Sequence, residues 1–341
     1  MSRIIPSLCI VVVLSLSPLV FAAANLEPLP PTELIIQPED TFVPDSPLVK
    51  AEKDFTFAWD DATTIEPNKN KIDALETMAK KACLASNYTV EDRKALGQLL
   101  YKLATYYTHV INTPDVAIPE FEKAQQLLTQ ETDLIWNKIQ LAYAYAQKFG
   151  LSDNASDKKN ALHYAQVIIK KYPHTQNKEV AFAYYVTALT LNNAKDYAKA
   201  QTNYEKALKI YDTLSAQNDD QYLRTKSRLA QTMLDQNNHD AEALAILEQT
   251  ADNWQARGHL TENPYAAKNL IVLGKAYLKV NKTEPAQDKF NQAIAIYAKL
   301  FGDKSILLIE PYEDLADTYK ILGNLNQMDT YLQKANALEK S

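Results

Sequence analysis

The chain has 341 residues, a formal net charge of −6 and 46% hydrophobic residues, with only six glycines but 20 tyrosines. An acidic chain argues against a nucleic-acid binder, because such proteins neutralise phosphates with clustered lysines and arginines, and against generic binding to anionic membranes. Cys9 and Cys83 are too few for a cysteine metal cluster, and we expect Cys83 to be a buried helix residue.

Residues 1–24 have the pattern of a cleaved secretory signal. Arg3 precedes an apolar run from Leu8 to Phe21, and residues 22–24 are the small alanines that a signal peptidase needs. No later segment approaches the roughly 20 apolar residues of a membrane span. We therefore expect a periplasmic or secreted protein, with an uncleaved anchor as the alternative. Cys9 lacks the preceding small residue of a lipoprotein signal, so lipid anchoring is not expected.

Residues 25–65 are expected to form an extended, proline-rich leader. Six prolines between residues 25 and 50 fix φ and remove backbone donors too often for a helix or a central strand. Phe55, Phe57 and Trp59 then alternate with polar or small residues. This pattern predicts a short strand or an aromatic edge packed on the helices. A disordered recruiting motif and a segment occupying the protein's own groove are the alternatives.

Residues 66–96 are predicted to contain an N-terminal capping helix and the start of the first repeat helix. Residues Thr89 to Asp92 resemble a capping box that opens this second helix. The first helix gathers apolar residues on one side from Lys71 onward, namely Ile72, Leu75, Ala79 and Ala82.

From residue 97 to the C-terminus, a pattern of two helix-length stretches recurs six times, at intervals of about 42 residues. Each stretch has one apolar face, which only a stacked neighbour can bury, so we expect the end repeats to be the least stable. A small residue marks each first stretch, at Ala104, Ala142, Ala188, Ala230, Gly274 and Ala316. Triplets spaced i, i+4, i+7 mark the second stretches: Ala117/Phe121/Ala124, Ala161/Ala165/Ile168, Ala200/Tyr204/Ala207, Ala243/Leu247/Thr250, Ala286/Phe290/Ala293 and Met328/Leu332/Ala335.

These residues resemble the tetratricopeptide repeat (TPR) over residues 97–341. Most repeats exceed the family's usual length of about 34 residues, and the segment from Ala293 to Asp303 is similar to the lengthened second helix of the kinesin-light-chain-like subgroup. The resemblance implies an all-α fold, a right-handed α-solenoid of about six antiparallel helix pairs. We expect Phe149 to Asp157 to form an extra loop inside the second repeat.

In this family, partners usually lie along the concave surface made by the first helices. The resemblance implies that an extended or helical peptide binds against the aromatic part of this groove, and that the acidic portion of the peptide meets the cationic part of the groove. The alternative buries the aromatics between adjacent first helices and pairs the lysines with Glu313 and Asp317. The candidate groove residues are Tyr101, Trp136, Tyr143, Phe182, Tyr185, Asn192, Arg224, Lys275 and Lys279.

No residue pattern predicts catalysis, a cofactor or a metal site. No two of the five histidines stand three or four residues apart, and no phosphate loop or nucleophile elbow occurs. The densest carboxylate cluster, Glu310, Glu313 and Asp317, is expected to be a solvated helix face or to form ion pairs with the preceding repeat.

The sequence therefore predicts a non-enzymatic protein–protein interaction scaffold of the bacterial cell envelope, which binds a protein or peptide partner in the groove. One alternative is a self-assembling repeat protein, a homo-oligomer that stacks through Leu325, Met328 and Leu332 of its terminal repeat. A further alternative is a superhelical envelope enzyme or enzyme subunit, which would need a deep cleft holding one glutamate of raised pKa.

Overall fold

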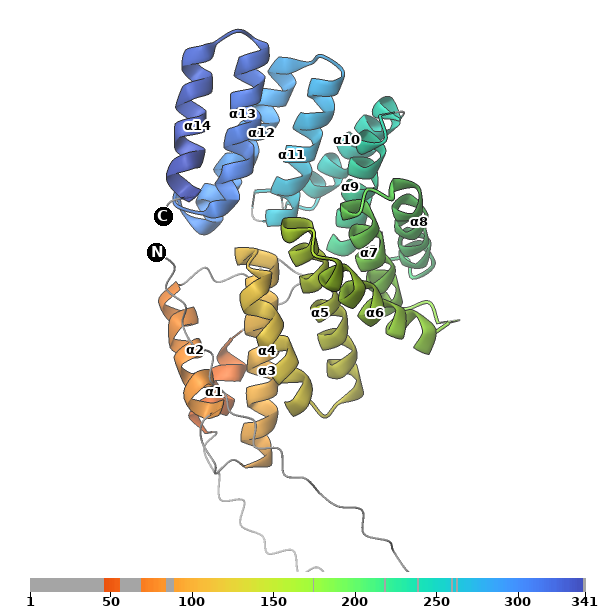
Figure 1. Cartoon of the computed structure of the whole chain (residues 1–341), viewed down its shortest axis with the longest axis vertical. Coiled ribbons are helices and arrows are strands. Elements are labelled where there is room, and N and C mark those ends of the chain that lie inside the picture. Colours follow the sequence, from red (N-terminus) through yellow and green to blue (C-terminus); the bar gives the residue numbers. More distant parts are fainter. Residues whose placement is uncertain are drawn as a thin grey trace, which may run out of the picture. The chain divides into compact units, whose positions relative to one another are not determined.

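The computed structural model describes residues 46–55, 69–83 and 89–339, except for positions 174, 218, 238, 259 and 262. The expected signal segment and most of the proline-rich leader, including Phe57 and Trp59, lie outside these residues. The side chain of Cys83 lies outside them too. Within the described part every regular element is helical (Figure 1), which agrees with the predicted all-α class.

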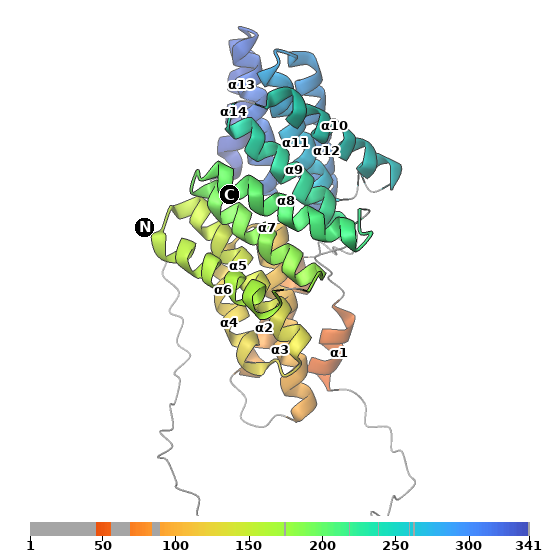
Figure 2. The same ribbon diagram turned by 90° about the vertical axis from the view of Figure 1, so that its right-hand side faces the viewer.

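Six helix pairs follow one another along the chain (Figures 1 and 2). In each pair the first helix packs on the second, and the second packs on the first helix of the next pair. This stacking of successive pairs is the architecture of an α-solenoid. The pairs are α3 (Val90–Tyr106) with α4 (Pro114–Leu127), α5 (Glu131–Ser152) with α6 (Ala155–Lys171), α7 (Lys178–Asn193) with α8 (Tyr197–Thr213), α9 (Asp220–Asp235) with α10 (Asp240–Ala256), α11 (Pro264–Lys279) with α12 (Thr283–Phe301), and α13 (Ile309–Ile321) with α14 (Leu325–Glu339).

The small residues of the repeat pattern lie where two helices of a pair meet. Gly274 of α11 faces Phe290 of α12 so closely that an added Cβ would stand 2.5 Å from the ring atom Cε1. The predicted triplets are fully buried in the first five pairs, but Leu332 of the last triplet is 37% exposed. The packing template is therefore confirmed, and the last pair is its least buried copy.

Helix starts and ends follow local capping rules. The predicted capping box at the start of α3 is confirmed, since Asp92 N donates to Thr89 Oγ1 at 3.0 Å and Thr89 N donates to Asp92 Oδ2 at 3.3 Å. Several helices end at an asparagine, aspartate, lysine or serine in the left-handed region, such as Asn281 with φ 60° between α11 and α12.

The extra loop predicted for Phe149 to Asp157 is wrong. Helix α5 continues to Ser152 and α6 begins at Ala155, so only two residues connect them. The longer helix forms because Phe149 is buried and anchors the added turn. Asp153 then takes a left-handed conformation, and Asn154 caps α6 by accepting from Ser156 N at 2.8 Å.

Two further helices, α1 (Pro47–Asp54) and α2 (Lys69–Cys83), pack on α3. Helix α1 occupies part of the range for which the prolines predicted an extended leader. A helix forms because Ser46 caps it and Pro47 stands in its first turn, where a missing N–H costs nothing. Phe55, at its end, is 2% exposed, and Lys102 of α3 donates to the Glu52 carbonyl at 2.8 Å. Phe55 therefore packs on the helices, as the sequence pattern predicted, and it ends a helix rather than lying in a short strand.

Across the described residues, no helix combines the length and the apolar character that crossing a membrane requires.

Candidate functional site: a pocket between first helices

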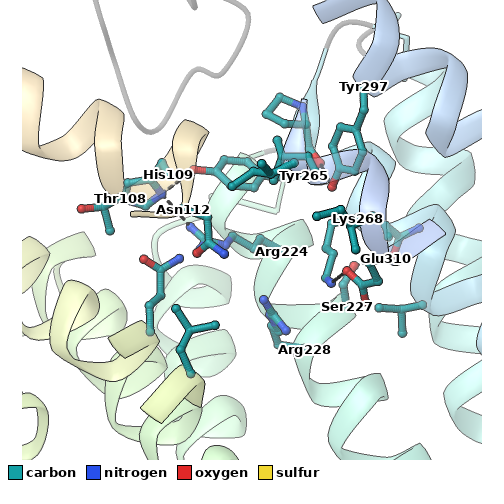
Figure 3. Close-up of a pocket in the computed structure, with 18 of the residues that line it drawn as sticks. Thr108, His109, Asn112, Arg224, Ser227, Arg228, Tyr265, Lys268, Tyr297 and Glu310 are labelled. Carbon is teal, nitrogen blue, oxygen red and sulfur yellow. Dashed lines mark hydrogen bonds and ion pairs between the residues drawn. The ribbon is translucent and has the colours of Figure 1, made fainter. Parts of the chain in front are cut away.

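A pocket of about 460 Å³ lies between helices that are far apart in the sequence (Figure 3). Its walls come from η2 (Tyr107–Ile111), a π-helical turn after α3, and from α5, α9, α11 and α13. A short 3₁₀ turn, η3 (Ile306–Leu308), and Tyr297 of α12 complete the lining. The first two repeats thus meet the fourth, fifth and sixth repeats around one cavity.

The π-helical turn places His109 in the wall of this pocket. Such turns add a residue to the helix and re-aim its side chains; this one ends at Asn112, whose φ is 57°. His109 Nε2 lies 2.8 Å from Gln140 Oε1, and its Nδ1 lies 2.7 Å from the Tyr265 hydroxyl. Gln140 Oε1 can only accept, so Nε2 carries the proton and Nδ1 accepts from Tyr265. His109 therefore joins the first repeat to the fifth.

The imidazole of His109 is held neutral. Burial lowers its pKa well below 6.5, and the charge of Arg224 lowers it further. The ring stacks on Tyr143 with a centroid separation of 4.7 Å. The neutral ring accepts from Tyr265 at Nδ1, and Arg224 Nη1 lies 3.4 Å from the same nitrogen. The side chain thus acts as a fixed hydrogen-bond acceptor at physiological pH.

Arg224 projects from α9 among tyrosine rings. Its guanidinium carbon lies 4.4 Å from the ring centroid of Tyr265, 4.8 Å from that of Tyr143 and 5.0 Å from that of Tyr185. It also donates to the Tyr143 hydroxyl. Cation–π contacts of this kind partly offset the loss of hydration of a buried guanidinium.

A second charged cluster borders the pocket at α11 and α13. Lys268 and Glu310 line the pocket and form an ion pair, and Lys275 donates to Glu310 at 2.8 Å. Burial alone would raise the pKa of Glu310, but the two lysine charges outweigh it and hold the pKa well below its usual value. Burial raises the pKa of Asp314 to about 7 although Lys275 lies 3.3 Å away. Asp314 does not line the pocket, so it is not the cleft carboxyl that the enzyme alternative requires.

The structure brings two of the predicted groove residues, Tyr143 and Arg224, to the pocket. Phe182 and Tyr185 are fully buried and Tyr143 is 2% exposed. Their rings pack together, with centroids 5.3 Å apart for Phe182 and Tyr185 and 5.9 Å apart for Tyr143 and Phe182. Adjacent first helices contact each other and cover these rings, which is the arrangement of the inter-helix alternative rather than of an open surface.

The remaining predicted groove residues lie away from the pocket. Tyr101, Trp136 and Asn192 are partly buried between neighbouring helices, and Asn192 Oδ1 accepts from Thr232 at 2.8 Å. Lys275 pairs with Glu310 and Asp314. The alternative prediction paired the lysines with Glu313 and Asp317, whereas the partners of Lys275 are Glu310 and Asp314.

Lys279 turns back toward the preceding repeat. Its Nζ donates to the Leu234 carbonyl and to Asn237 Oδ1, and it lies 3.7 Å from Asp240 Oδ1. A partner-binding role for Lys279 and the other groove residues stays a prediction.

Sequence reasoning did not single out Arg228 or Tyr265, both of which line the pocket. The signal for Arg228 is its spacing, because it follows Arg224 by four residues and so shares a helix face with it. No comparable signal exists for Tyr265. Its contact with His109 joins positions 156 residues apart.

No group of three or more histidine, cysteine, aspartate or glutamate side chains is placed to hold a metal ion in the part of the chain that the structure describes. The expectation of no metal and no cofactor stays a prediction.

No protein-family model matches the sequence, and no curated protein matches it. Solved structures, in contrast, do match this chain. A Rap protein in complex with the competence and sporulation factor is similar with a TM-score of 0.56 and 14% identity, over 81% of this chain and 81% of that chain. The apo form of RapI is similar with a TM-score of 0.54 and 15% identity, over 79% of this chain and 90% of that one.

BtubC (BKLC) from P. vanneervenii is similar with a TM-score of 0.46 and 17% identity, over 74% of this chain and 92% of that chain. At these identities the similarity concerns the fold. With its six stacked helix pairs and its buried small-residue template, the chain has the fold of the TPR-like repeat proteins.

Proposed function

We propose that this protein is a non-enzymatic interaction scaffold that binds a segment of a partner protein at the mouth of the pocket. The observation that carries the proposal is the convergence of side chains from five repeats on one cavity. The similar Rap structure holds the competence and sporulation factor, which supports ligand binding by a protein of this fold.

The mouth of the pocket offers an apolar contact. Leu151, at the end of α5, lines the pocket and is 67% exposed. Gln147, one turn earlier, is partly exposed beside the same cavity, and Glu313 on α13 is exposed there. A leucine surrounded by polar residues can supply the apolar centre of a protein contact, with the polar residues as its rim.

The pattern of residues 1–24 supports a location in the bacterial cell envelope, periplasmic or secreted after cleavage. A scaffold in that compartment would hold envelope proteins together.

Paired charge variants test the binding site. Leu151→Glu should remove a specific protein from affinity-purified complexes, whereas Leu214→Glu, at a 38% exposed leucine ending α8, should not. Quantitative mass spectrometry of both preparations measures the difference. Equal partner recovery with the two variants would show that the pocket mouth is not the contact.

Self-assembly is a second candidate, because the terminal helix pair exposes apolar side chains. Leu322 is 51% exposed, Leu325 58% and Leu332 37%. Light scattering over a concentration series measures the association. If the terminal pair stacks on a second copy, Leu325→Lys should shift the mass of the native protein from oligomer to monomer. A native protein that is already monomeric at all concentrations would rule this candidate out.

A further inference from the structure

Arg224 and Arg228 lie one turn apart on α9, and both line the pocket (Figure 3). In the figure they extend into the space that His109 and Tyr265 border on one side and Lys268 and Glu310 on the other. Arg224 is 6% exposed, and Arg228 is partly buried. Two guanidinium groups thus share one enclosed space.

Neither guanidinium is neutralised within the described residues. The hydrogen bonds of Arg224 go to the Tyr143 hydroxyl, to Gln221 Oε1 at 3.4 Å and to the neutral His109. In the same part of the chain, Arg228 makes no side-chain hydrogen bond or ion pair. A buried charge is normally paired or fully hydrogen-bonded, so this arrangement lacks its counter-charge.

The acidic residues of the pocket do not supply that charge. Glu310 is held by Lys268 and Lys275. Glu313, the other lining carboxylate, forms no ion pair with either arginine within the described residues. The positive charge of Arg224 also acts against that of Arg228. Guanidinium groups do not lose their protons in proteins, so an incoming anion would relieve this repulsion.

We propose that the pocket binds an oxyanion-bearing small molecule, whose carboxylate or phosphate group is clamped by Arg224 and Arg228. Guanidinium groups match such anions because their N–H donors form a planar fork that can bond two oxygens at once. The neighbouring tyrosine rings exclude water from Arg224 and leave its position fixed.

The rest of the pocket fits an organic ligand of modest size. Its volume of about 460 Å³ lies in the range of about 300–1,000 Å³ typical of small-molecule sites. Val272, Ile306 and Leu307 form an apolar part of the lining. The ligand would therefore place its anionic group at α9 and its carbon skeleton toward α11 and η3.

This site goes beyond the scaffold function, because its ligand is a free small molecule and no partner protein is needed to observe it. The ligand would contact the first, fourth and fifth repeats together. Its binding should therefore slow amide hydrogen exchange in η2 (Tyr107–Ile111) and α11 (Pro264–Lys279) at the same time.

Calorimetry on the purified full chain tests the proposal, with inorganic phosphate and succinate as separate probes and chloride at matched ionic strength as the reference. We expect at least one probe to bind, to raise the melting temperature and to slow exchange in η2 and α11. Phosphate alone would identify a phosphate ligand, and succinate alone a carboxylate ligand.

Arg228→Gln should weaken binding at least tenfold without lowering the urea midpoint of the free protein, because the side chain of Arg228 makes no hydrogen bond or ion pair within the described residues. Arg228→Lys should restore part of the affinity. Lys226→Gln is the matched control: it removes the same charge from α9 at a residue that does not line the pocket and bonds Gln249 instead. The proposal is overturned if neither probe binds above the chloride reference, or if Arg228→Gln binds as tightly as the native protein.

Discussion

The close approach of α11 and α12 gives a quantitative test of how the repeats pack. A Cβ at Gly274 would stand 2.5, 2.8 and 2.9 Å from three ring atoms of Phe290. Phe290 is fully buried, so its ring has no solvent-filled space to move into and the two helices must separate. Overpacking of this kind costs about 1–3 kcal/mol, whereas alanine gains about 1 kcal/mol of helix propensity over glycine.

Because the clash is with a rigid ring, we place the strain near the top of that range. The free energy of unfolding of Gly274→Ala should then fall by about 1–2 kcal/mol, measured by circular dichroism in urea. Gly150→Ala is the matched control. A Cβ at position 150 would meet the side-chain amide of Asn193 at 2.6 Å. That side chain can rotate away, so the control variant should lose only the hydrogen bond from Asn193 to the Ala146 carbonyl.

A double variant separates the clash from other effects. In Gly274→Ala/Phe290→Leu the colliding ring atoms are gone, so the double variant should be more stable than the sum of the two single changes predicts, by at least about 0.5 kcal/mol. The packing argument fails if Gly274→Ala is as stable as the native protein, or if the two single effects are additive.

Four further outcomes follow from the same structure. Tyr185→Ala should lower the free energy of unfolding by about 3–5 kcal/mol, as for other buried aromatics, in urea unfolding; a loss below about 1 kcal/mol would contradict its place in the core. The pKa of Asp314 is about 7 in the folded state, against an ordinary value of 3.8. Between these two pH values the folded state therefore holds a proton on Asp314 that the unfolded state has released. Stability should therefore fall as pH rises through that window, and Asp314→Asn should flatten this slope in urea titrations at several pH values. Phe55→Ala should speed amide exchange in α1 but leave α8 unchanged, because α8 packs on α7 and α9 and repeats that do not touch are coupled only through their neighbours; faster exchange in both would refute this. Mass spectrometry of the secreted or periplasmic protein should find a mature chain beginning at Asn25, and an intact residue 1 would refute signal cleavage.

The repeat architecture could be predicted because it depends on local periodicity. The spacing of Ala286, Phe290 and Ala293 fixes one buried helix face, and Gly274 marks the helix that packs on it. The same reasoning missed α1, because six prolines in one stretch outweighed the single capping signal of Ser46 and Pro47. The helical extension at Phe149 was missed because tertiary packing stabilises it.

The pocket could be predicted only in part. The resemblance to the family pointed to the first helices and reached Tyr143 and Arg224, but it does not say whether a side chain is open or covered. Whether Phe182 and Tyr185 are covered depends on how closely successive first helices approach. The contact between His109 and Tyr265 depends on the fold as a whole, since it joins residues 156 positions apart.

Photo-crosslinking in the native host tests the scaffold function most directly. A photoreactive residue in place of Leu151, at the pocket mouth, should yield a defined protein adduct, and the same residue in place of Leu214, at the end of α8, should not. Adducts of equal yield at both positions, or none at position 151, would contradict partner recognition at this pocket.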